Sequence, residues 1–177
     1  MKSSNEGSGD RAHSIRKAGL DPIDCRILEE LQRDARLSSA ELGRRVHLSA
    51  PAVAARVGRL EDAGVITGYR AELSLAALGL DVMAFIRVRS ESSVHRALLA
   101  ALAERREVLE CHHVTGEDCF IVKVAAGSLG HLEEVVADLA GFGSTTTSIV
   151  FSTAIARRTV TVDAATSSPA PPSPGQR

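Results

Sequence analysis

The hydrophobic pattern changes its period once along the chain. From residue 20 to residue 64, apolar side chains recur every three or four positions, as in the stripe of Ile23, Ile27, Leu28 and Leu31. This spacing places them on one face of a helix. From residue 80 onward, apolar runs of strand length are separated by two helical segments. The pattern therefore predicts a helical N-terminal part followed by an α+β part.

Start signals divide the N-terminal part into helices. Asp21 precedes Pro22, so an N-cap is followed by the residue favoured at the first helical position. Ser38 and Glu41 have the Ser-x-x-Glu spacing of a capping box, which predicts a second helix that ends near Val46. Two helices are thus expected before residue 47.

A third helix is predicted after a short turn at residues 47 and 48. We expect Ser49 to cap this helix, with Pro51 in its first turn, and Gly64 to end it. The residues that follow Gly64, with the sequence VITGY, are expected to begin a strand. Two helices joined by such a turn are typical of a helix-turn-helix, here of a winged-helix-like form.

The second part has the element order βαββαβ. Strands are predicted at residues 81–89, 108–116, 118–126 and 144–156, and helices at residues 93–107 and 128–142. This order is that of the ferredoxin-like fold, whose helices cover one face of an antiparallel sheet. The other face needs a partner. A second copy of the chain is the simplest one, so a homodimer is expected.

Composition limits the classes of protein that the chain can form. Its 177 residues are 44% hydrophobic and carry a net charge of −1, which argues against coating nucleic acid by bulk charge. The three cysteines and the absence of a long apolar run predict a cytoplasmic protein with no membrane partner. We expect a disordered leader at 1–19, a helix-turn-helix domain at 20–68, a linker at 69–80, a ferredoxin-like domain at 81–160 and a disordered tail at 161–177.

Positive charge is concentrated on the predicted helix-turn-helix. No acid occurs between Glu41 and Glu61, whereas four arginines do. On a helical wheel, one flank of the third helix carries alanines and arginines. We expect both arginines to reach outward, where they can bind guanine edges or phosphate. The alternative is an ordinary solvated helix face. The predicted DNA-binding residues are Ser39, Arg44, Arg45, Ser49, Ala52, Ala55, Arg56 and Arg59.

The stretch from residue 20 to residue 69 closely resembles the helix-turn-helix of the Lrp/AsnC transcriptional regulators, the feast/famine regulatory proteins. The resemblance continues through Gly79, the βαββαβ order and the motif VTGEDCF to about residue 160. The matching residues of the helical part are Leu20, Asp21, Asp24, Ile27, Leu28, Leu31, Gln32, Arg36, Glu41, Leu42, Leu48, Ser49, Val53, Arg56, Val57, Leu60, Glu61, Gly64, Ile66, Gly68 and Tyr69.

This resemblance implies a sequence-specific DNA-binding transcriptional regulator, not an enzyme, with no cofactor. It also implies that the ferredoxin-like domain, called RAM in this family, dimerises, can assemble into octamers and can bind an amino acid. A dimer would present its two recognition helices to half-sites about one DNA turn apart.

Three residues depart from the family pattern. His47 stands where the turn usually has glycine, and histidine tolerates a left-handed backbone better than most residues. Gly43 replaces a usual alanine inside the second helix, which costs about 1 kcal/mol unless closer helix packing offsets it. Cys119 replaces an aspartate of the VTGEDCF loop, and a neutral thiol cannot pair with a ligand ammonium.

An effector site is predicted where the VTGEDCF loop meets the threonine-rich last strand. Glycine allows a ligand to approach the backbone, and hydroxyl groups suit a carboxylate. The alternative is an ordinary hairpin turn beside an ordinary strand. The predicted effector-binding residues are Gly116, Asp118, Thr146 and Ser148.

Other chemistry is weakly indicated. Cys111, His112, His113 and Cys119 lie close in sequence, but strand alternation sends the two histidines to opposite faces, so we expect no metal site. Siroheme decarboxylases resemble this architecture and use histidines on a tetrapyrrole, so an enzyme is one alternative. A small-molecule-binding oligomeric module without DNA activity is another.

Overall fold

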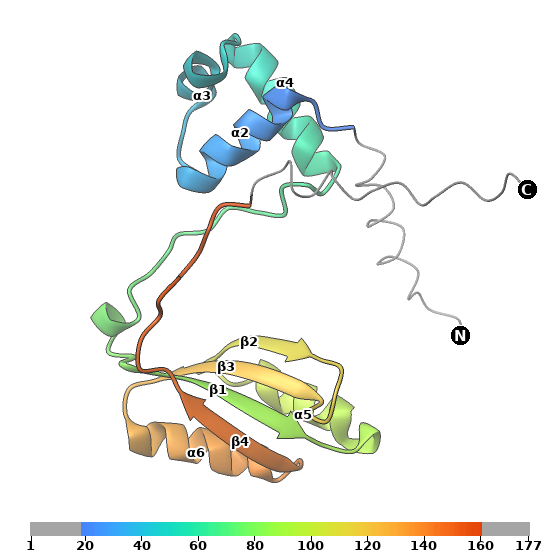
Figure 1. The fold of residues 1–177 in the computed structure, drawn as a ribbon, viewed down its shortest axis with the longest axis vertical. Helices are drawn as coiled ribbons and strands as arrows, with labels where there is room; N and C mark the ends of the chain where they lie inside the picture. Colours follow the sequence, from blue (N-terminus) through green and yellow to red (C-terminus); the bar gives the residue numbers. More distant parts are fainter. Residues whose placement is uncertain (1–18, 161–177) are drawn as a thin grey trace, which may run out of the picture. The chain divides into compact units, whose positions relative to one another are not determined.

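The computed structural model describes residues 19–160 (Figure 1). The chain divides into two units. The helical unit comprises the chain up to Ala71 together with the segment from Arg157 onward, and the sheet unit comprises Glu72–Ala156. The predicted leader and tail lie outside the described residues, apart from residue 19. Among the described residues, no helix is long and apolar enough to cross a membrane.

The helical unit contains α2 (Pro22–Arg33), α3 (Ser39–Val46) and α4 (Ala50–Asp62). Both predicted N-caps of α2 and α3 are confirmed, because Asp21 and Ser38 each accept backbone N–H groups and each completes a capping box. The helices enclose a small aliphatic core of Ile27, Leu28, Leu42, Val46, Val53 and Leu60.

The turn between α3 and α4 confirms both sequence expectations for this region. His47 adopts a left-handed conformation with φ 59° and ψ 43°. A Cβ atom added at Gly43 would lie 2.5 Å from the carbonyl oxygen of Leu48. The glycine therefore allows the turn to pack directly on α3, which is the closer packing that could offset its low helix propensity.

The predicted strand after Gly64 is wrong: residues 65–70 form no strand. The N–H groups of Val65 and Ile66 both donate to the carbonyl oxygen of Leu60, at 2.9 and 3.1 Å. Both side chains pack on the helical core. These residues thus close the end of α4 instead of pairing with another strand, and an unpaired strand is not stable by itself.

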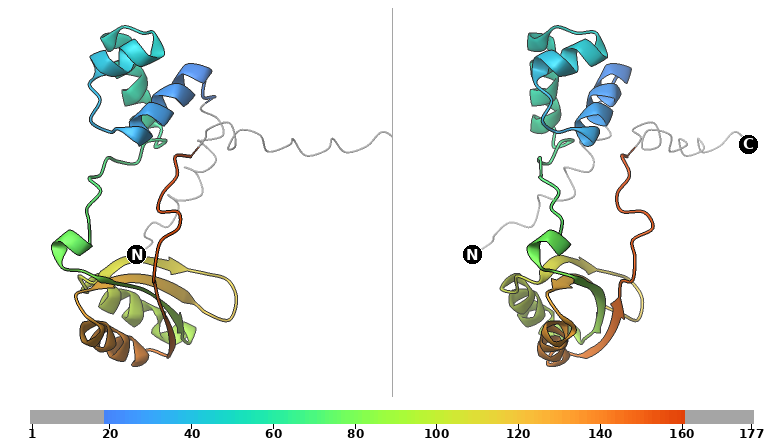
Figure 2. Two further views of the ribbon diagram at one scale, coloured as in Figure 1. Left: turned by 60° about the vertical axis from the view of Figure 1, so that its left-hand side comes forward. Right: turned by 90° about the vertical axis from the view of Figure 1, so that its left-hand side faces the viewer.

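The sheet unit has the predicted ferredoxin-like topology. The strands are β1 (Val82–Arg89), β2 (Val108–His113), β3 (Phe120–Ala126) and β4 (Ser144–Ile149), in the antiparallel order β2-β3-β1-β4. The helices α5 (His95–Ala103) and α6 (Leu129–Ala140) lie on one side of the sheet (Figure 2). Short 3-10 turns occur at Ala76–Leu78 and Ser92–Val94.

All six elements of the sheet unit are shorter than predicted, and the last strand and the first helix differ most. The last strand ends at Ile149, which pairs with Ala84 of β1. The N–H of Val150 still donates to the carbonyl oxygen of Met83, but none of the described residues after it is in a strand. The helix predicted at residues 93–107 is α5, which begins at His95 after a 3-10 turn. The core lies between the sheet and its two helices. On the open face, Phe85 remains 38% exposed.

Candidate nucleic-acid interface

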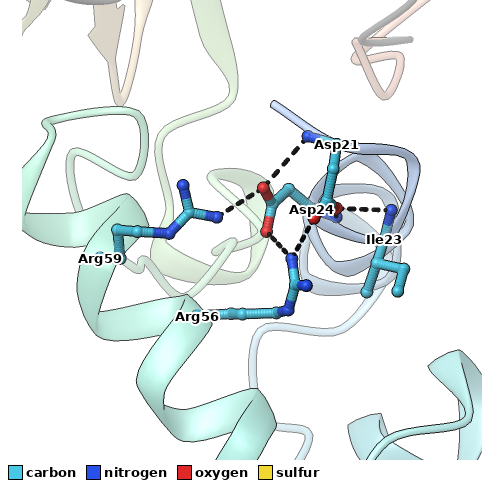
Figure 3. Close-up of polar contacts among 5 residues, drawn as sticks. All are labelled: Asp21, Ile23, Asp24, Arg56 and Arg59. Atoms are coloured by element: carbon cyan, nitrogen blue, oxygen red, sulfur yellow. Dashed lines mark hydrogen bonds and ion pairs between the residues drawn. The ribbon is translucent and has the colours of Figure 1, made fainter. Parts of the chain in front are cut away.

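Two aspartates at the start of α2 bind two arginines of α4 (Figure 3). Arg56 donates from Nη1 to Asp21 Oδ2 at 2.5 Å and to Asp24 Oδ1 at 2.9 Å. Arg59 donates from Nη2 to Asp24 Oδ2 at 2.6 Å. The Asp24 carboxylate therefore binds both arginines, whereas the Asp21 carboxylate binds only Arg56.

The two aspartates differ in their exposure. The Asp24 side chain is completely buried, whereas that of Asp21 is 42% exposed. Burial favours the neutral form of Asp24, but hydrogen bonds from Arg59 and Arg56 outweigh it and lower its pKa. The hydrogen bond from Arg56 lowers the pKa of Asp21. Both groups are thus carboxylates at neutral pH, and they hold the arginines in defined positions.

The wheel-based expectation that both arginines extend freely outward is wrong for this structure. The helix does bury Val53 and Leu60, as expected, but both guanidinium groups turn toward α2. The reason is the buried charge of Asp24, which needs cationic partners. A guanidinium has five N–H donors, and the contacts with the two aspartates engage only Nη1 of Arg56 and Nη2 of Arg59. The side chains are 28% and 50% exposed, so donors remain for a ligand.

The other predicted DNA-binding residues lie on α3, at the N-cap of α4 and along α4. Ser39, Arg44 and Ala55 are exposed, and Ala52 is half-buried. Arg45 forms an ion pair with Glu30 at 2.6 Å, which the sequence did not indicate. Ser49 occupies the N-cap position of α4, but its side chain makes no capping hydrogen bond, so that part of the prediction is wrong. The exposed hydroxyl of Ser49 therefore remains available.

The predicted effector residues gather around Arg87 on the open face of the sheet. The Arg87 guanidinium lies 3.6 Å from Asp118 Oδ2, and Arg87 pairs with Thr146 across β1 and β4. Ser148 pairs with Phe85, two residues further along the same two strands. Gly116 has φ 115° at the tip of the β2–β3 hairpin. Three of the four residues are thus neighbours, with Gly116 on the adjoining loop.

A cavity of about 480 Å³ lies elsewhere in the sheet unit, and none of the four predicted effector residues lines it. It is formed by Arg89, Ser90, Glu91, Val94, Phe142 and Gly143. The hydroxyl of Ser90 is buried, and among the described residues it has no hydrogen-bond partner. The thiol of Cys119, at the position where the family usually has aspartate, donates to the carbonyl oxygen of Ser90 at 3.1 Å.

The two neighbouring histidines do lie on opposite faces of the sheet. His113 stacks on Phe120 and touches the ring of His95, whereas His112 contacts Glu110. Within residues 19–160, no group of three or more His, Cys, Asp or Glu side chains is arranged to hold a metal ion.

The cluster formed by Asp21, Asp24, Arg56 and Arg59 was only half foreseen from the sequence. The sequence predicts Asp21 as the N-cap of α2, which the structure confirms, but it predicts neither aspartate as a ligand for arginine. The sequence does contain one signal for this cluster: two acids three residues apart, Asp21 and Asp24, and a later acid-free predicted helix that is rich in arginine. Neither periodicity nor local charge reveals that these two helix faces meet.

A helix-turn-helix joined to a ferredoxin-like sheet defines a class of DNA-binding regulator with a ligand-binding domain, and comparisons with known proteins agree. Residues 20–67 match the winged helix-turn-helix DNA-binding family, and residues 83–160 match the Lrp/AsnC ligand binding domain. The uncharacterized HTH-type transcriptional regulator YezC of Bacillus subtilis is 40% identical over 133 residues, which are 75% of this chain and 94% of YezC. The chain belongs to the Lrp/AsnC family of transcriptional regulators.

Other relatives and solved structures support the same assignment. The leucine-responsive regulatory protein of Rhizobium meliloti is 42% identical over 121 residues, which are 66% of this chain and 77% of that protein. The structure of B. subtilis LrpC has a TM-score of 0.75 at 32% identity and covers 78% of this chain and 99% of LrpC. Regulator NMB0573 of Neisseria meningitidis, in complex with L-Met, has a TM-score of 0.77 at 29% identity, covering 82% and 99%.

These findings decide between the alternatives left open by the sequence. The relatives are transcriptional regulators with a helix-turn-helix, so the chain is a regulator and not an enzyme. The siroheme-decarboxylase-like alternative has no support among them. An oligomeric module without DNA activity is also disfavoured, because the DNA-binding domain is matched over its full helical extent.

Proposed function

We propose that this regulator binds specific double-stranded DNA through the flank of α4 that carries Ala52, Ala55, Arg56 and Arg59. One observation carries the proposal: the buried carboxylate of Asp24 fixes both arginines while each keeps unused N–H donors. Fixed side chains lose less conformational freedom on binding, which favours affinity. The small alanines allow the helix to enter the major groove closely, and the arginine donors then contact base edges or phosphates.

Residues of α3 and the N-cap residue of α4 supply contacts to the DNA backbone. The hydroxyl of Ser49 does not cap α4, so the first N–H groups of this helix and the hydroxyl can both meet a phosphate. Arg44 is exposed, and Arg45 is held by Glu30 near the end of α3. Ser39 begins α3 on the exposed side. These groups position the protein on DNA, whereas α4 reads sequence.

Gel retardation with fragments selected from random DNA tests this assignment. Arg59→Ala should weaken binding to the selected site by about 1–3 kcal/mol and relax sequence preference. Arg44→Ala should weaken binding to all sequences and reduce the salt slope by about one. Arg96→Ala, an exposed arginine on α5, is the matched control and should have no effect. Unchanged retardation by both helical-unit variants would refute the assignment.

We infer that the open face of the sheet is the dimer interface. This face carries the apolar side chain of Phe85, which is 38% exposed, and a second copy would cover it. Such a dimer would present two α4 helices to half-sites one DNA turn apart, and it can assemble further into octamers. Phe85→Glu should give monomers in analytical ultracentrifugation, and persistence of the dimer would refute this interface.

We also propose that an amino acid modulates the regulator by binding near Arg87. A guanidinium suits the ligand carboxylate, Asp118 is the nearest acid for an ammonium, and the hydroxyls of Thr146 and Ser148 lie beside them. NMB0573, a related regulator, has been solved in complex with L-Met. Thermal-shift measurements with an amino-acid panel, on the wild type and on Arg87→Ala, test the proposal. We expect the regulator to act in the cytoplasm.

A further inference from the structure

Nη1 of Arg56 lies between two carboxylates of unequal accessibility. Asp24, its inner partner, is completely buried, whereas Asp21, its outer partner, is 42% exposed (Figure 3). A ligand that arrives from solvent can replace the outer carboxylate without disturbing the inner one. The site that Asp21 Oδ2 occupies is therefore one that an anionic oxygen already fits, 2.5 Å from the guanidinium nitrogen.

We propose that Asp21 is a displaceable counter-ion that competes with DNA for Arg56. On binding, a phosphate oxygen of the DNA backbone takes the place of Asp21 Oδ2, while Asp24 keeps the arginine anchored. This inference rests on the proposed function of α4. It makes Asp21 a residue that weakens binding to DNA in general, so that binding depends more on the base contacts made elsewhere on α4.

The two oxygens of Asp21 have separate tasks, which makes the exchange possible. Oδ1 accepts the backbone N–H groups of Ile23 and Asp24, at 2.9 and 2.8 Å, and so caps α2. Only Oδ2 contacts Arg56. Releasing the arginine therefore leaves the N-cap of α2 intact. The Asp21 side chain is 42% exposed, so water and dissolved ions compete for this ion pair, and it can be exchanged for one to a phosphate.

The exchange leaves a negative charge close to the DNA backbone. The freed Asp21 carboxylate is repelled by phosphate and takes up a cation from solution, which reduces the net release of counter-ions on binding. Two measurable effects on DNA binding are therefore expected when Asp21 loses its charge. Removing this charge should strengthen binding, and it should make binding more sensitive to salt.

Asp21→Asn removes the charge and preserves the cap, because asparagine is as good an N-cap residue as aspartate. We expect this variant of the full-length chain to bind unrelated duplex DNA about two- to fivefold more tightly than wild type at low salt. The slope of log affinity against log salt should be steeper by up to about one. Asp21→Ser, another strong N-cap residue, is a second variant that should behave in the same way.

Asp62→Asn is the matched control. It makes the same change in net charge at an exposed residue at the end of α4, outside the cluster. The second control repeats Asp21→Asn in an Arg56→Ala background, where the gain should disappear because the competition has no target. Circular dichroism of each variant verifies that the helices are retained.

The possible outcomes distinguish the role of Asp21 from DNA binding by α4. A gain that is specific to Asp21 and abolished by Arg56→Ala supports the proposal. A gain equal to that of Asp62→Asn, no gain, or a gain that persists without Arg56 overturns it while leaving DNA binding by α4 in place. Failure of the wild type to retain any DNA overturns the proposed function, and this inference with it.

Discussion

Removing the buried carboxylate of Asp24 should loosen the whole helical unit. Asp24 accepts three hydrogen bonds: from Arg59 at 2.6 Å, from Arg56 at 2.9 Å and from the backbone N–H of Asp21 at 3.2 Å. The two bonds from arginine tie the start of α2 to α4, and the third belongs to the capping box of α2. Asp24→Ala breaks all three and leaves two arginines without their shared anchor.

The expected loss in the free energy of unfolding on Asp24→Ala is the balance of opposing effects. A hydrogen bond to a charged group contributes about 1.5–3 kcal/mol, so three such bonds set an upper bound near 5–9 kcal/mol. The arginine side chains are 28% and 50% exposed, so water replaces most of what they lose. The variant also avoids the cost of burying a carboxylate, which is several kcal/mol. We therefore expect a net loss of about 2–3 kcal/mol.

Hydrogen exchange of the α2 and α4 amides measures this loss within the unit concerned. A loss of about 2–3 kcal/mol lowers protection roughly 30- to 150-fold. The pKa of Asp24 is lowered from 3.8, so its stabilisation is complete above that pH and is lost as the pH falls through the folded-state pKa. The difference between wild type and Asp24→Ala should therefore shrink as the pH falls below 3.8. Equal protection at pH 7, or a difference that acid leaves unchanged, would refute the reasoning.

Three further predictions follow from single residues. Gly43→Ala should lower the free energy of unfolding by about 1–3 kcal/mol although alanine is the better helix former, because its Cβ would meet Leu48; a higher melting temperature would contradict this. His47→Gly should stabilise by up to about 1 kcal/mol in the same melts, since it relieves a left-handed histidine, and a lower melting temperature would count against that reading. Burial raises the pKa of Cys111, so mass spectrometry should find slower alkylation at pH 8 in native protein than in urea, and equal rates would exclude this effect.

Local signals account for most of what the sequence predicts correctly. Capping residues specify where α2 and α3 begin, because those hydrogen bonds are made within four residues of each other. The hydrophobic period places β1 and β3, since alternate residues of both strands are buried in the core. The left-handed turn at His47 was expected from the family resemblance, because the turn usually has glycine at this position.

The errors arise where distant residues decide the outcome. Val65 and Ile66 have strand propensity, but Leu60 takes up their N–H groups and the helical core takes their side chains. The helical wheel correctly separates Val53 from Arg56, yet it contains no information about Asp24, which lies 32 residues earlier in the sequence. The candidate DNA-binding flank of α4 could thus be proposed from the sequence, whereas the direction in which its arginines point depends on the packing of α2 on α4.

The central claim is that one flank of α4 meets DNA, and a pair of neighbouring alanines tests it most directly. Ala54 and Ala55 are both exposed, but a rotation of about 100° per residue puts Ala55 on the flank of the arginines and Ala54 on the other side. In gel retardation on a selected operator, Ala55→Glu should reduce affinity at least about tenfold, because a carboxylate then faces phosphate, and Ala54→Glu should bind as wild type does. Equal effects of the two substitutions, or a loss confined to Ala54→Glu, would contradict the account.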